Sequence, residues 1–151
     1  DILKIFIIYI MIIFIMNINM IYIMNILSIS SLFFITNAFY SRSKKYNLYS
    51  KFFIFLTLSS FIYHSMEYNI YTEMIDKVAV LLVIFYGFHL VYKKFSKDNI
   101  YIIVPIVITF LSTIYIHYYA KVKVDLITSR KYHFILHVLS SVGHNLIIYL
   151  P

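Results

Sequence analysis

The chain has 151 residues, of which 62% are hydrophobic, 20% aromatic and only 13% charged. A mean hydropathy of +0.86 excludes an ordinary soluble domain and predicts an integral membrane protein. The absence of cysteine excludes disulfides and thiolate metal ligands, and the net charge of +7 lies in short loops, where it favours lipid headgroups over nucleic acid as the partner.

Apolar segments follow one another along the chain at roughly the 20-residue length that a bilayer demands. Residues 1–21 form a hydrophobic N-terminal segment, for which a signal sequence, an anchor and an extra span all stay open. Residues 22–151 form a second unit, for which we predict spans at 22–40, 51–68, 76–92, 99–119 and 131–150. The predicted fold class is therefore all-α, a polytopic transmembrane helical bundle of about five to six spans.

Two pairs of polar residues stand four positions apart in these apolar runs: Ser60 with His64, and His133 with His137. Residues at this spacing share one face of a helix. Ionisable residues inside a membrane are costly and usually mark a site or a pathway. Because three neutral imidazoles and an open water position are typical of catalytic zinc, we predict zinc bound by His64, His133 and His137.

A count of the crossings predicts that these residues and Asp76 lie near the same leaflet. His64 falls near the end of span 51–68, Asp76 starts the next span, and His133 starts the last one after two further crossings. Basic loops favour the cytoplasmic side, which puts the site on the luminal side. One basic segment disagrees with this orientation, because it would lie in the lumen; it contains Lys121, Lys123, Arg130 and Lys131.

The chain contains the segments SSLFFITN, which ends at Asn37, SSFIYH followed by TEMIDKVA, and the tail HFILHVLSSVGHN. These segments resemble motifs of the CREST superfamily of seven-span membrane hydrolases, and the closest likeness is to the branch that remodels the lipids of GPI anchors. The chain departs from that branch in three ways. One extra residue separates His64 from Asp76, and the cysteine-rich luminal region of that branch has no counterpart here. The stretch between Asp76 and His133 is also short enough to lack about two spans. We therefore expect a shortened version of the seven-span fold.

The resemblance implies a zinc-dependent hydrolase that removes a fatty acyl chain from a GPI lipid in the endoplasmic reticulum or Golgi. Asp76 would act as the general base toward the zinc-activated water. Ser60 would orient that water or donate to the developing oxyanion.

Three further residues are candidates for supporting roles. Glu73 is either solvated or a hydrogen-bond partner of a zinc ligand. His144 stands two turns after His137, where it supports the site or makes an interhelical contact. Asn37 is expected to tie the first span to the bundle.

Other interpretations stay open at this point. Taken singly, a serine in a transmembrane helix more often bonds to its own backbone, and a histidine bonds across helices about as often as it binds metal. The alternatives to GPI-lipid hydrolysis are amide cleavage of ceramide, as in the alkaline ceramidases, a non-catalytic relative of the receptor-like or fusion type, and a structural membrane protein with incidental histidines. The sequence also leaves open whether the shortened bundle forms an oligomer.

Overall fold

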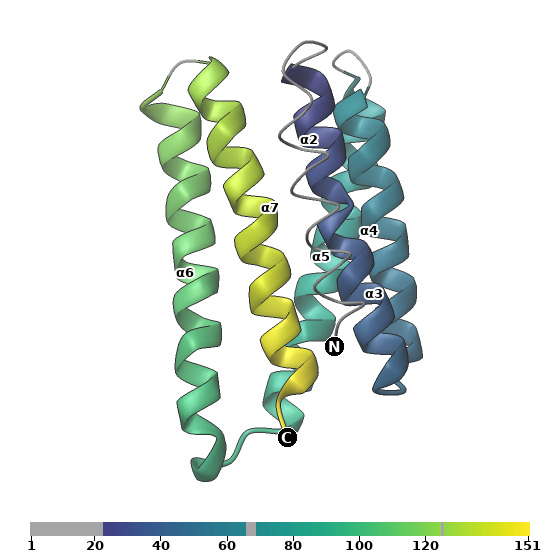
Figure 1. Ribbon diagram of the computed structural model, residues 1–151, viewed down its shortest axis with the longest axis vertical. Coiled ribbons are helices and arrows are strands. Elements are labelled where there is room, and N and C mark those ends of the chain that lie inside the picture. The colour runs from purple at the N-terminus through teal and green to yellow at the C-terminus, as the bar shows by residue number, and fades with distance from the viewer. Residues whose placement is uncertain (1–22, 66–68, 125) are drawn as a thin grey trace, which may run out of the picture.

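The computed structural model describes residues 23–65, 69–124 and 126–151, and helices make up almost all of these (Figure 1). The predicted N-terminal segment 1–21 lies outside the described residues. The helices are α2 (Ile23–Ser31), α3 (Phe33–Ser43), α4 (Asn47–Ser65), α5 (Ile70–Lys93), the short 3-10 helix η1 (Lys97–Asn99), α6 (Ile100–Val122) and α7 (Leu126–Tyr149). The described residues contain no strand, which confirms the all-α class.

The helix bounds agree with the predicted spans except at some ends. Span 22–40 comprises α2 and α3, which are separated by a single turn at Leu32 with the short-range bonds Leu32 N to Ile29 O and Ile35 N to Leu32 O. The predicted start of the span 76–92 is wrong, because α5 already begins at Ile70.

The early start of α5 has a local cause. The side chain of Asn69 accepts a hydrogen bond from the Tyr71 amide at 2.8 Å and so caps the first turn. Asp76 consequently lies inside α5, in its second turn, and not at its start. Its carboxylate accepts a hydrogen bond from Ser59 of the preceding helix α4.

The helices run side by side along the long axis of the molecule, with α7 between α6 and the remaining helices (Figure 1). Helix α6 packs on α7, and α7 packs in turn on α2, α3 and α5. Helix α4 contacts α2, α3 and α5. Helices α2 and α3, which make up the predicted span 22–40, thus touch both α4 and α7. These two helices carry the predicted zinc ligands.

The end of α7 is fixed by two lysines. Lys94 donates to the Leu150 carbonyl and lies over the Tyr46 ring, and Lys44 lies over the ring of Tyr149. Cations at a helix C-terminus interact favourably with the helix dipole.

The interior of the bundle contains many polar side chains, and its outside exposes many large apolar ones. The buried polar residues are Ser28, Ser30, Ser31, Asn37, Ser41, Ser50, Thr57, Ser59, Ser60, His137, Ser141 and His144. Large apolar side chains on the outer helices are exposed, including Phe85 at 68% and Ile114 at 66%. These polar residues lie beside an apolar core that includes Phe53, Val83 and Ile147.

Two helical segments, Ile70–Lys93 and Lys97–Val122, are long and apolar enough to cross a membrane. Only 22% and 11% of their most apolar windows are buried inside the protein. Apolar helices in soluble proteins cover such surface with protein, so these two fit the membrane class predicted from the composition.

Candidate metal centre

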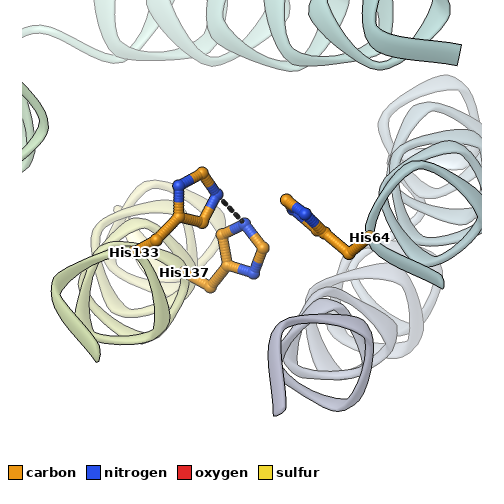
Figure 2. Close-up of side chains that lie close together, drawn as sticks. All are labelled: His64, His133 and His137. Atoms are coloured by element: carbon orange, nitrogen blue, oxygen red, sulfur yellow. Dashed lines mark hydrogen bonds between the residues drawn. The ribbon is translucent and has the colours of Figure 1, made fainter. Parts of the chain in front are cut away.

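Three histidines from two helices converge near one end of the bundle, as the crossing count predicts. His64 lies in the last turn of α4, and His133 and His137 lie one turn apart on α7. Their nearest ring nitrogens all lie within 4.8 Å of one another. Figure 2 shows the rings of His133 and His137 on one helix facing the ring of His64 on the other. The i, i+4 spacing predicted for α7 is what brings its two rings together.

The ring nitrogens have a pattern of partners that suits a metal ion. The Nε2 atoms of His133 and His137 are 3.1 Å apart. The Nε2 atom of His64 is buried and has no hydrogen-bond partner among the described residues. Buried polar atoms are almost always paired, so an orphaned nitrogen beside two other imidazoles points to a missing partner.

The distances are compatible with zinc. Two nitrogens bound to one tetrahedral zinc at about 2.05 Å each are about 3.3 Å apart. The His133–His137 pair is already near this value, and His64 needs to approach by about 1.5 Å at most to reach it from the 4.8 Å limit. Three neutral imidazoles, with no thiolate in the chain, form a donor set that zinc accepts.

The second ring nitrogen of His137 contacts a serine of α2. The Oγ atom of Ser30 is 2.7 Å from Nδ1 of His137 and also donates to the Leu27 carbonyl at 2.7 Å. Ser30 is fully buried, and His137 is nearly so. Histidine ligands of metals usually have such a partner on the second ring nitrogen.

The two residues predicted to act on substrate belong to a neighbouring hydroxyl cluster. Asp76 Oδ1 accepts a hydrogen bond from Ser59 at 3.1 Å, and its carboxylate also contacts the Ser60 hydroxyl. Ser60 in turn accepts from Ser31 at 3.0 Å. Asp76 is thus held by hydroxyl groups of α4 and is not one of the groups that converge with the three histidines.

The predicted supporting residues have contacts of three kinds. Glu73 forms an ion pair with Lys77 at 2.5 Å, one turn along α5. His144 is buried among aromatic rings, with Nδ1 2.5 Å from the Tyr49 hydroxyl. Asn37 is fully buried and bonds to α7, so the first span is tied to the last helix.

Sequence reasoning missed the hydroxyl groups that contact His137 and the Ser60–Asp76 cluster, namely Ser30, Ser31 and Ser59, as well as the Tyr49 hydroxyl that contacts His144. One signal was available. Ser30 stands seven residues, or two turns, before Asn37 and therefore shares its face of the first span. A face with two buried polar positions indicates packing against another polar helix.

Comparisons of the chain with protein-family models, with curated proteins and with solved structures find no match.

Proposed function

We propose that this chain is a membrane-embedded zinc hydrolase of about five to six spans, a shortened relative of the CREST superfamily. The observation that carries the proposal is the convergence of His64, His133 and His137 from two helices. The membrane part is supported by the large apolar side chains exposed on the outside, and by the two helices of sufficient length and apolarity. Ionisable groups in such a setting are usually functional.

The three histidines would hold zinc through their ring nitrogens. When bound, zinc supplies a Lewis acid that lowers the pKa of water to about 7 and polarises a carbonyl oxygen. Asp76 would accept the proton of the attacking water and return it to the leaving group. The Ser59 hydroxyl would orient the Asp76 carboxylate, and the Ser60 hydroxyl would donate to the oxyanion as it forms.

The proposed substrate is a membrane lipid with an acyl chain in ester linkage, and a GPI lipid in the endoplasmic reticulum or Golgi is preferred. This preference rests on the likeness of SSLFFITN and TEMIDKVA to the GPI-remodelling branch. An amide lipid of the ceramide type is the alternative substrate for the same donor set, since polarisation of a carbonyl serves both bonds.

One observation favours a second candidate, a metal-binding relative without catalysis. The Asp76 carboxylate is engaged by hydroxyl groups and does not join the histidine cluster. In that case zinc would tie α4 to α7 and stabilise the bundle.

The first experiment measures zinc by elemental analysis of the protein purified in detergent. We expect about one zinc per chain in the parent, and a loss of zinc when both His133 and His137 are replaced by alanine. His89→Ala is the matched control, because His89 is an exposed histidine on α5 outside the cluster. A folded parent without zinc, or equal loss in the control, would contradict the metal site.

The second experiment separates the two candidates. The zinc-loaded parent, Asp76→Asn and Ser60→Ala are incubated in mixed micelles with a GPI lipid or with ceramide, and released fatty acid is measured. The hydrolase proposal expects release by the parent and a decrease of about 100-fold or more in Asp76→Asn. Zinc without release from either lipid favours the non-catalytic relative.

A further inference from the structure

We propose that Ser30 is a positioning residue for the metal centre: its hydroxyl fixes the tautomer and the ring orientation of His137, so that Nε2 presents a lone pair to the ion. This inference rests on the metal site of the proposed function. Ser30 lies in α2, whereas the three proposed ligands lie in α4 and α7. Metal binding would therefore depend on a third helix.

The assignment follows from counting protons. A serine hydroxyl has one proton, and a backbone carbonyl can only accept. The Ser30 hydroxyl lies 2.7 Å from the Leu27 carbonyl and donates its proton there. Its oxygen must therefore accept at the other contact, from Nδ1–H of His137 at 2.7 Å.

The consequence for His137 is a defined tautomer. A neutral imidazole carries one N–H, so protonation at Nδ1 leaves the lone pair on Nε2. That Nε2 atom is the one that lies 3.1 Å from Nε2 of His133, and His137 belongs to the converging group with His64. The Ser30 contact thus selects the tautomer that can bind a metal at this point.

The surroundings make the contact hard to replace. Ser30 is 0% exposed and His137 is 5% exposed, so water has little access to the hydrogen bond. Helix α2 packs against both α4 and α7, which places Ser30 at the junction of the two ligand-bearing helices. Removal of the hydroxyl would free the ring to adopt the other tautomer or to rotate.

The next residue provides a matched control. Ser31 is also 0% exposed, and its hydroxyl oxygen also lies near the Leu27 carbonyl, at 3.2 Å. Its other contact is the Ser60 hydroxyl at 3.0 Å and not a metal ligand. The variants Ser30→Ala and Ser31→Ala therefore remove similar groups from the same turn, and only the first removes the partner of a ligand.

The test measures zinc affinity by competition with a chelator for the purified parent, Ser30→Ala and Ser31→Ala. Loss of a hydrogen-bond partner of a ligand typically weakens metal binding by about 10- to 100-fold. We expect this loss in Ser30→Ala and a change of less than about threefold in Ser31→Ala. Equal affinity of Ser30→Ala and the parent, or an equal loss in both variants, would overturn the proposal.

A second measurement is made on the parent protein and does not depend on how well Ser30→Ala folds. Nitrogen-15 NMR of histidine-labelled, metal-free parent protein reports the tautomer of each buried imidazole, and His137→Asn identifies the signal. We expect protonation at Nδ1 of His137. Protonation at Nε2 in a parent that binds zinc overturns the role of Ser30, whereas a parent that binds no zinc overturns the metal site itself.

Discussion

Replacement of Asn37 by alanine should destabilise the bundle by separating the first helices from α7. Asn37 is fully buried and makes three hydrogen bonds to α7: Nδ2 donates to the Ser141 carbonyl at 2.8 Å and to Asn145 Oδ1 at 2.9 Å, and Oδ1 accepts from Ser141 Oγ at 2.7 Å. Alanine removes all three bonds at once.

The magnitude follows from the number of bonds. Interhelical hydrogen bonds in membrane proteins contribute about 0.6 kcal/mol each on average and about 1.7 kcal/mol at most, which gives about 2 to 5 kcal/mol for three. Ser141 Oγ keeps an alternative acceptor, the Phe33 carbonyl at 3.3 Å. We therefore expect a value near the lower end, about 2 kcal/mol.

The assay is reversible unfolding in mixed micelles, monitored by circular dichroism, for the parent and Asn37→Ala. Thr36→Val is the matched control, because Thr36 precedes Asn37 and its hydroxyl bonds within α3, to the Phe33 carbonyl at 2.7 Å. A loss below about 0.5 kcal/mol in Asn37→Ala, or a loss equal to that in the control, would refute the reasoning that this residue joins the first span to α7.

Three further predictions concern the packing of α7 and the proposed metal. Gly143→Ala should cost about 1–3 kcal/mol, because its Cβ would lie 2.7 Å from Oγ1 of Thr109, which is held within α6; unchanged unfolding would contradict this close approach of α6 and α7. Tyr49→Phe should cost about 1–3 kcal/mol by leaving Nδ1 of His144 unpaired in the interior, whereas Tyr92→Phe, at an 85% exposed position, should have no effect on thermal unfolding. Zinc at about 100 times its Kd should stabilise the protein by about 2.7 kcal/mol, so a chelator should lower the melting temperature of the parent and leave the double histidine variant unchanged; a parent insensitive to chelation would count against a metal that joins α4 to α7.

The helices and the histidine cluster were accessible from the sequence because both depend on local spacing. The lengths of the apolar runs predict the helices, and the four-residue spacing of His133 and His137 puts both rings on one face of α7. The count of crossings then places His64 at the same end of the bundle. The predicted start of the span 76–92 was wrong for a local reason as well, since the helix cap at Asn69 was not recognised.

The hydroxyl groups were not accessible in the same way. Serines and threonines are frequent in this chain. Their hydroxyl groups in an apolar helix bond most often to the backbone of the same helix, as that of Thr57 does to the Phe53 carbonyl. Whether Ser30 or Ser31 meets a ligand depends on the rotation of α2 against α7, which no local pattern specifies. The position of Asp76 beside Ser59 likewise depends on how α4 and α5 pack.

The contacts of the first span with α7 nevertheless share one register. Ser30 meets His137, and Asn37, seven residues later, meets Ser141 and Asn145, four and eight residues after His137. The two helices therefore run in the same direction, and the two contacts are separated by about 10 Å of helix. A slide of α7 by one turn, about 5.4 Å, would break both contacts together and move His137 away from His64. Asn37 touches no ligand, but it maintains the register on which the convergence of the three histidines depends, and these buried polar contacts thus specify the site as well as stabilising the bundle.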